Sequence, residues 1–157
     1  INKVTAPMND FYPPDEESVL TDYTLDISIP ITFWKEERGN LFCPKESNEN
    51  ACVFIIQHFD RWGSPSEAAD DILGKYAEQV EDFEIFDEEE TFTKDGFYAY
   101  RVGTYFTIDG KNYEGSHLFV QVQNVVFQIM SYGTRGTIDK YREDLKQITD
   151  SFSFEYF

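Results

Sequence analysis

The chain has 157 residues, of which 41% are hydrophobic and 17% aromatic, which is enough for one domain with a sizeable core and excludes a disordered chain. Its 30 acidic residues outnumber its 13 basic ones, and the net charge of −17 makes nucleic acids and anionic membrane surfaces poor partners. Cations, basic peptides and basic protein surfaces are favoured instead, although the same charge can serve solubility alone.

The beginning of the sequence predicts an extended segment. Residues 1–21 contain three prolines and the acidic run Asp15-Glu16-Glu17, so we expect a lead-in or tether here and a single domain over residues 22–157. The chain starts at Ile1, as a processed secretory or lipid-anchored precursor would, and as a trimmed chain would. Because no apolar run approaches about 20 residues, we expect no transmembrane segment.

The first regular element is a strand. Apolar and polar residues alternate from Tyr23 to Ile29, which predicts a strand with one buried face, and Pro30 ends it. Phe33 and Trp34 are then expected in a turn.

The two cysteines flank the next predicted turn. Cys43 and Cys52 stand on either side of the loop PKESNENA, with apolar residues outside both. Two short strands joined by this loop would bring the cysteines together, so a disulfide is geometrically reasonable in an oxidising compartment. Two free, half-buried thiols are the alternative, and the spacing does not fit a Cys-x-x-Cys metal or redox motif.

A helix is predicted after the second of these strands. Ser64 is a suitable cap, Pro65 suits the first helical position, and Glu67 completes a capping box. Apolar residues at helical spacing extend the predicted helix to about Phe83, and a strand is expected over residues 84–92.

The strongest local signal is Asp109-Gly110, a dipeptide that favours a type I′ hairpin turn between strands at 97–108 and 111–123. The turn predicts four cross-strand pairs, which are Ile108 with Lys111, Phe106 with Tyr113, Val102 with His117 and Tyr100 with Phe119. Both faces of this hairpin carry apolar residues, which predicts cover on both sides of the sheet. A strand over 125–132, a helix over 137–148 and a short strand within 151–157 complete the expected elements.

The order of these elements resembles a known fold group. The sequence contains, in this order, a strand ending in SIP, a following Trp, the helix SPSEAADDIL, the hairpin strand DGFYAYRVGTYFTIDG, the strand VVFQIMSYGT and a terminal SFSF. This pattern resembles the group that joins the photosystem II subunit PsbP with the Ran-binding protein Mog, and looks most like its bacterial secreted and lipoprotein members. Over about Tyr23 to Phe154 the resemblance implies an α+β fold, an antiparallel sheet of about six to eight strands between helices. The plant protein binds photosystem subunits and helps to retain inorganic cations, but no motif carries particular residues over from it.

The densest acidic cluster supplies candidate metal ligands. Carboxylates suit calcium or manganese, and the candidates are Asp82, Glu84, Asp87 and Glu89. The spacing does not fit an EF-hand loop, and alternation along a strand splits the wider cluster between two faces. An edge strand whose charges prevent aggregation is the simpler interpretation.

Catalytic residues are harder to find. His58 and His117 are the only histidines, and His58 stands two residues from Asp60 as a candidate ligand pair. Ser116 precedes His117, but adjacent residues of a strand point to opposite faces and cannot act as nucleophile and base. With no Gly-x-Ser-x-Gly signature either, we expect no catalytic residue and no enzymatic activity.

Four residues are candidates for contact with a partner. Trp34, Phe59 and Trp62 lie in predicted connections, where aromatic side chains often bind partners or else cover the ends of a sheet. Arg135 lies in the turn Gly133–Gly136 before the last helix, where it could help hold an anion or belong to a plain connection.

These features together predict a non-enzymatic secreted or cell-envelope domain that binds another protein or a basic peptide and needs no cofactor. A weak calcium- or manganese-binding accessory protein, a hydrolase and a cytoplasmic trafficking adaptor are the alternatives.

Overall fold

The computed structural model describes residues 2–7, 23–30, 33–38, 41–46, 51–59, 62–122 and 125–156. Within them the chain forms ten strands and two helices. In chain order they are β1 (Asn2–Pro7), β2 (Tyr23–Ile29), β3 (Trp34–Arg38), β4 (Leu41–Pro44), β5 (Ala51–Phe59), α1 (Pro65–Ala77), β6 (Glu81–Phe92), β7 (Tyr98–Ile108), β8 (Lys111–Val122), β9 (Val125–Thr134), α2 (Ile138–Asp150) and β10 (Ser153–Tyr156).

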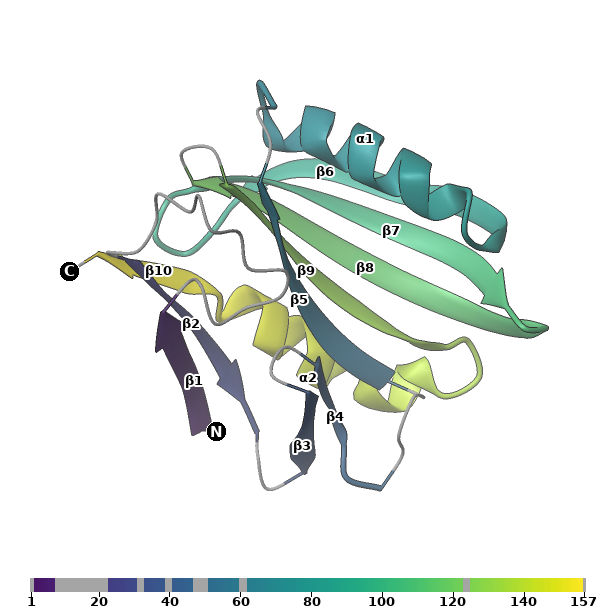
Figure 1. Cartoon of the computed structure of the whole chain (residues 1–157). Helices are drawn as coiled ribbons and strands as arrows, with labels where there is room; N and C mark the ends of the chain where they lie inside the picture. The colour runs from purple at the N-terminus through teal and green to yellow at the C-terminus, as the bar shows by residue number, and fades with distance from the viewer. Residues whose placement is uncertain are drawn as a thin grey trace.

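Seven strands form the main antiparallel sheet, in the order β3-β4-β5-β9-β8-β7-β6. β1, β2 and β10 form a second sheet with β2 in the middle. Figure 1 shows α1 over β6, β7 and β8 and α2 on the other side of the sheet, where it packs against β9, β5 and β2. The predicted α+β fold, an antiparallel sheet covered by helices, is therefore confirmed.

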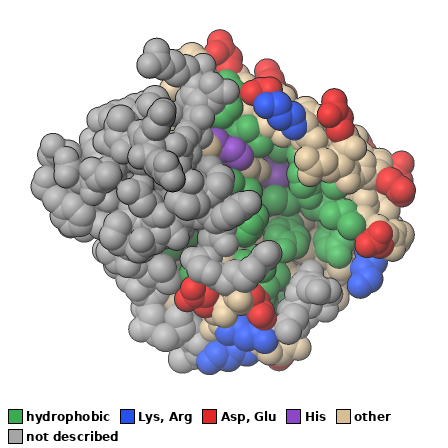
Figure 2. All heavy atoms as spheres, in the orientation of Figure 1, with side chains coloured by type: hydrophobic (Ala, Val, Ile, Leu, Met, Phe, Trp, Pro, Cys, Tyr) green, Lys and Arg blue, Asp and Glu red, His purple; other side chains and the backbone are tan. Residues whose placement is uncertain are grey.

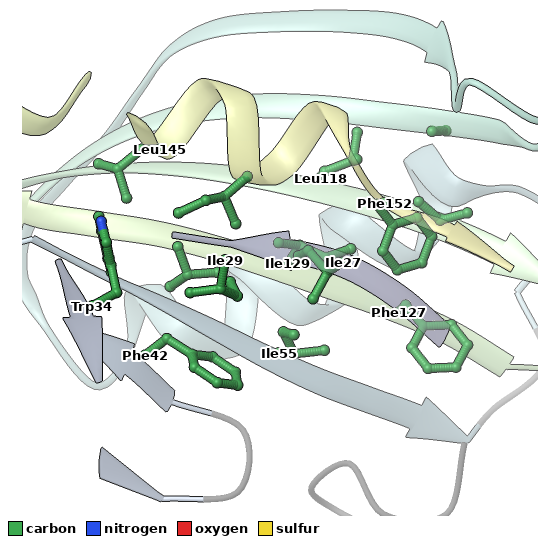
Figure 3. Close-up of a cluster of buried hydrophobic side chains, with 14 of the residues drawn as sticks. Ile27, Ile29, Trp34, Phe42, Ile55, Leu118, Phe127, Ile129, Leu145 and Phe152 are labelled. Atoms are coloured by element: carbon green, nitrogen blue, oxygen red, sulfur yellow. The ribbon is translucent and has the colours of Figure 1, made fainter. Parts of the chain in front are cut away.

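Alternation along the central strands divides the core into two layers. The larger layer lies between the sheet, α2 and β2, and Figure 3 shows Ile27 and Ile29 of β2 facing Phe127 and Ile129 of β9. The smaller layer lies under α1 and consists of Ala68, Ala69, Leu73, Val102, Phe119 and Val126. Burial of apolar side chains on both faces explains why the central strands read as nearly continuous hydrophobic runs.

The β7–β8 hairpin has the predicted register. Asp109 and Gly110 have φ angles of 51° and 78°, and a type I′ turn requires positive φ at both central residues. All four predicted cross-strand pairs are present. His117 therefore lies on the face that carries α1, opposite Val102.

Helix α1 begins as predicted and ends earlier. The hydroxyl of Ser64 accepts a hydrogen bond from the backbone N–H of Glu67 at 3.2 Å, which caps the helix. The helix ends at Ala77, so the predicted extension to Phe83 is wrong. Phe83 lies on β6 instead, and its ring packs edge-on against Tyr76 at 6.2 Å across the intervening turn. The apolar residue that seemed to continue the helical pattern is thus a contact made by the returning chain.

Two expectations near the beginning of the chain need correction. Residues 2–7, expected in a lead-in or tether, form β1 and pair antiparallel with β2. Trp34, expected in a turn, begins β3 and lies opposite Pro44 of β4. Each segment becomes a strand through backbone pairing with a strand that follows it in the chain, and the local composition did not reveal that pairing. The remainder of the predicted lead-in, 8–22, lies outside the described residues.

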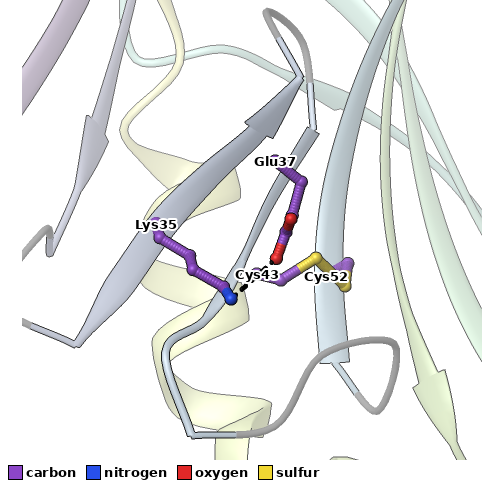
Figure 4. Close-up of a disulfide and its surroundings, with 4 residues drawn as sticks. All are labelled: Lys35, Glu37, Cys43 and Cys52. Carbon is purple, nitrogen blue, oxygen red and sulfur yellow. Dashed lines mark ion pairs between the residues drawn. A yellow bond between two sulfur atoms is a disulfide. The ribbon is translucent and has the colours of Figure 1, made fainter.

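Cys43 of β4 and Cys52 of β5 form a disulfide with Cα atoms 4.4 Å apart. Both cysteines are buried. Figure 4 shows the disulfide next to β3, where Lys35 Nζ and Glu37 Oε1 form an ion pair at 3.1 Å. The structure therefore contains the pairing that the loop spacing indicated, rather than two free thiols.

Candidate functional site

The face of the sheet that carries α1 holds a chain of hydrogen-bonded polar side chains. His58 Nε2 donates to Gln128 Oε1 at 2.9 Å, and Gln128 Nε2 donates to His117 Nδ1 at 2.9 Å. His117 Nε2 lies 3.0 Å from Thr104 Oγ1, which in turn contacts the carbonyl of Gly115. We call these four side chains, His58, Gln128, His117 and Thr104, the polar chain. It brings together both histidines of the protein.

The hydrogen bonds of the polar chain all point the same way, each side chain donating to the next. Because an amide N–H can only donate, Nδ1 of His117 must accept, which leaves Nε2 protonated and able to donate to Thr104. His117 is 0% exposed, and burial lowers the pKa of its imidazole to about 3. Burial also lowers the pKa of His58, which lies nearer the surface. Burial thus disfavours the protonated form of both rings, and it does so most strongly for His117.

The two hydroxyl groups nearest to His117 in the sheet lie in different places. Ser116 lies opposite Gly103 and next to His117 in β8, so its side chain points to the α2 side, away from the His117 ring. The hydroxyl that His117 does contact, that of Thr104, is fully buried. Asp60, the other member of the predicted ligand pair, lies outside the described residues.

The histidines of the polar chain lie within a hollow among apolar side chains. Figure 2 shows hydrophobic side chains gathered below α1 with histidine among them, and acidic side chains around the border. Four rings contact one another near the end of the hairpin, and they are Tyr76 of α1, Phe106 of β7, Tyr113 of β8 and Tyr132 of β9. We call this group the aromatic cluster. Helical and strand periodicity did not single it out, because its members come from four different elements.

The carboxylates predicted as metal ligands lie on β6, at the edge of the main sheet. Across residues 2–7, 23–30, 33–38, 41–46, 51–59, 62–122 and 125–156, no three His, Cys, Asp or Glu side chains form a group that could hold a metal ion. The structure therefore does not assemble a site from Asp82, Glu84, Asp87 and Glu89. Register shifts between Glu81 and Glu84 and between Ile85 and Asp87 disturb the strand, and Glu89 pairs with Arg101 instead.

An exposed aromatic stack stands beside these carboxylates. The rings of Phe86 and Tyr105 stack at 4.3 Å, and the guanidinium of Arg135 lies 4.0 Å above the Tyr105 ring. Gly103 makes the stack possible, because a Cβ atom there would lie 2.6 Å from the Phe86 ring. Of the four predicted partner-binding residues, Arg135 is thus exposed and joined to an aromatic surface.

The other predicted partner-binding residues have different environments. Trp34 is 1% exposed and packs edge-on against Tyr141 of α2, so it belongs to the core and cannot meet a partner. Trp62 is half-buried, and its indole N–H donates to Asp71 of α1 at 3.2 Å, which anchors the start of the helix. The side chain of Phe59, at the end of β5, lies outside the described part of the structure.

No helix among the described residues is both long enough and apolar enough to span a membrane. No protein-family model matches the chain, and no curated protein matches it either.

Solved structures do match. LpqN of Mycobacterium tuberculosis, described as involved in cell envelope biogenesis, is 15% identical with a TM-score of 0.65 over 98% of this chain and 92% of its own. A protein of unknown function from Pseudomonas aeruginosa is 14% identical with a TM-score of 0.62 over 96% of both chains. The cyanobacterial PsbP of Synechocystis is 9% identical with a TM-score of 0.58 over 99% of this chain and 93% of its own. The chain therefore has a PsbP-like fold, as its sequence indicated.

Proposed function

We propose that this chain is a non-enzymatic accessory domain of the cell envelope or the extracellular space, which binds another protein and works without a cofactor. Its likeness to LpqN, a cell-envelope protein, and to PsbP supports this role by analogy of fold alone. The Cys43–Cys52 disulfide supports an oxidising compartment.

The observation that carries the proposal is the concentration of exposed apolar side chains on the edge strand β6. Five large hydrophobic side chains are exposed in the described part of the chain, and three of them belong to β6. Ile85, Phe86 and Phe92 are 41%, 46% and 66% exposed. Exposed apolar groups that share one edge are typical of an interaction surface rather than of a solvated one.

The charge of β6 indicates the kind of partner. The strand carries seven carboxylates and no basic residue in twelve positions. An edge strand offers unpaired backbone N–H and C=O groups, to which an extended segment of another protein can add as a further strand. The two register shifts lie before Asp87, so residues 87–92 form the regular stretch. We propose that a lysine- or arginine-rich extended segment pairs there, with Phe92 and Tyr98 contacting its apolar side chains.

A peptide titration tests this surface. An alternating Lys–Val peptide should shift the backbone NMR signals of residues 87–92 and bind more weakly as salt rises, whereas an alternating Glu–Val peptide should not bind. The variant Glu88→Lys with Glu90→Lys should abolish binding. The variant Glu36→Lys with Glu143→Lys is a matched control, because it makes the same change in net charge at exposed positions on β3 and α2. Equal loss in both variants would show that only the overall charge attracts the peptide and would reject β6 as the surface.

A further inference from the structure

A cavity of about 310 Å³ lies between α2 and the face of the main sheet opposite the polar chain. Figure 1 shows α2 on this side of the sheet. The paired residues Leu118 and Ile129 belong to the core layer under α2, but the next pair on the same face of β8 and β9 is Ser116 with Ser131. These two small side chains leave space under the helix. We call this space the α2 cavity, and its volume is at the lower end of the range for small-molecule sites.

Arg101 of β7 lines the α2 cavity and has hydrogen-bonding capacity left. Its side chain is only 25% exposed. Nε lies 3.6 Å from Glu89 Oε1 and Nη2 lies 3.4 Å from Asp150 Oδ1, whereas charge-assisted hydrogen bonds are about 2.7–2.9 Å long. Nη1 makes no hydrogen bond to any residue that the structure describes. A guanidinium with such long contacts gains free energy when an anionic group completes its hydrogen bonds.

The other arginine of the α2 cavity is already satisfied. Arg142 of α2 donates two hydrogen bonds to Glu114, at 2.5 and 3.2 Å, and two to Asp139, at 2.6 and 3.1 Å. These bonds use all three nitrogens of its guanidinium, and they raise its pKa. Arg142 is therefore a fixed wall of the cavity, and Arg101 is the guanidinium that a ligand can engage.

Hydroxyl groups stand beside Arg101 on the sheet. Ser116 lies opposite Gly103, which is two residues from Arg101 on β7 and so on the same face. The Ser116 hydroxyl makes no hydrogen bond within the described part of the chain, and the Ser131 hydroxyl makes a long one of 3.4 Å to the Ser116 carbonyl. A guanidinium fork with hydroxyl groups next to it supplies the donors that recognise a carboxylate.

The charges around the α2 cavity decide which carboxylate fits. Glu89 borders the cavity, and the protein has a net charge of −17, so a plain anion is repelled. An ammonium group on the same ligand removes this repulsion, because the ligand then has no net charge and its ammonium can pair with Glu89. The buried side chain of Leu145 adds an apolar wall.

We propose that the α2 cavity binds a free α-amino acid with an aliphatic side chain. Its carboxylate binds Arg101 and the Ser116 hydroxyl. Its ammonium group pairs with Glu89, and its side chain packs against Leu145. The ligand thus exchanges the loose Arg101–Glu89 contact for two charged contacts of its own.

L-valine and two of its analogues test the proposal. Isovalerate lacks only the ammonium group and isobutylamine lacks only the carboxylate, so both keep the branched side chain. Calorimetric titration at neutral pH should show saturable binding of L-valine, with each analogue at least about tenfold weaker. NMR titration should place the shifts induced by L-valine at Arg101, Ser116 and Ser131. Equal affinity for isovalerate would overturn the amino-acid site, and absence of saturable L-valine binding would reject it outright.

Substitutions test the two charged contacts separately. Arg101→Gln should weaken L-valine binding at least about tenfold, whereas the control Lys75→Gln removes the same charge from an exposed position on α1 and should stay within about twofold of the natural chain. Glu89→Gln gives a second measurement should Arg101→Gln fail to fold. It should weaken L-valine binding at least about threefold without weakening that of isovalerate, and Glu36→Gln on β3 is its control.

The outcome that refutes the assignment is unchanged L-valine binding in folded Arg101→Gln or in Glu89→Gln, or an equal loss in the matched control. Arg101→Gln should not weaken binding of the Lys–Val peptide to β6, because it removes a positive charge from the neighbourhood of a basic peptide. Failure of either proposal can therefore be recognised separately.

Discussion

His117 makes the stability of the protein depend on pH in a range where carboxylates hardly titrate. Its pKa is about 3 in the folded protein, against an ordinary value of 6.5 in the unfolded chain. As the pH falls below 6.5, the unfolded chain takes up a proton at this residue and the folded protein does not. The unfolded state therefore binds more protons, and the free energy of unfolding decreases with falling pH until about pH 3.

The expected size of this effect follows from the two pKa values. Each pH unit well below 6.5 costs about 1.4 kcal/mol, so acidification from pH 7 to pH 5 should remove about 2 kcal/mol of stability through His117 alone. His58, whose pKa is also lowered, adds a loss of the same sign. The variant His117→Gln keeps hydrogen-bonding groups at this position and removes the titration, so its stability should fall about 2 kcal/mol less over the same interval.

Urea unfolding of both proteins at pH 7 and pH 5 measures this difference. The comparison between variants cancels the contribution of His58 and of the carboxylates, which are present in both. An NMR titration of the His117 ring provides a direct reading that does not depend on the variant. The reasoning is refuted if the ring protonates above about pH 5, or if natural chain and variant lose the same free energy.

Three further changes test the fold. Reduction of the disulfide, which closes a short loop, should lower the free energy of unfolding by about 2.5 kcal/mol, and identical urea midpoints with and without reductant would contradict this. Ser64→Ala removes the cap of α1 and should cost about 1 kcal/mol, seen as a lower Tm in a thermal melt. Gly115→Ala would place a Cβ atom 2.9 Å from Thr104 Oγ1 and should cost about 1–3 kcal/mol, while Gly136→Ala, which has open space, should change stability little.

The parts of the fold that could be predicted are those set by neighbours in the chain. Asp109-Gly110 determines the turn, and the turn determines every pair along β7 and β8. The cap at Ser64 and the loop between the cysteines act over similarly short distances. Trp34 shows the limit: its neighbours suggested a turn, but pairing with β4 and packing against Tyr141 of α2 place it in the core.

The candidate site could be predicted only in part for the same reason. His58 and His117 were visible as the two histidines, but Gln128, which joins them, carried no signal of its own. Its position opposite Phe119 becomes meaningful once β8 and β9 are paired. The acidic residues of β6 were noticed as possible ligands, but no three His, Cys, Asp or Glu side chains of the described part of the chain come together as a metal site.

The second sheet has a consequence for the order in which the protein folds. β2 lies between β1, which precedes it, and β10, which pairs Ser153 with Asp26 from the far end of the described chain. During synthesis, β2 can pair with β1 early, but its other edge cannot pair until β10 has emerged. Ile27 and Ile29, which are fully buried in the finished protein, then lack part of their cover while the chain grows. Pairing between β2 and β10 is slow, because the two strands are far apart in the sequence. The growing chain therefore exposes one edge of β2 for longer than it exposes the strands of the β7–β8 hairpin to each other unpaired.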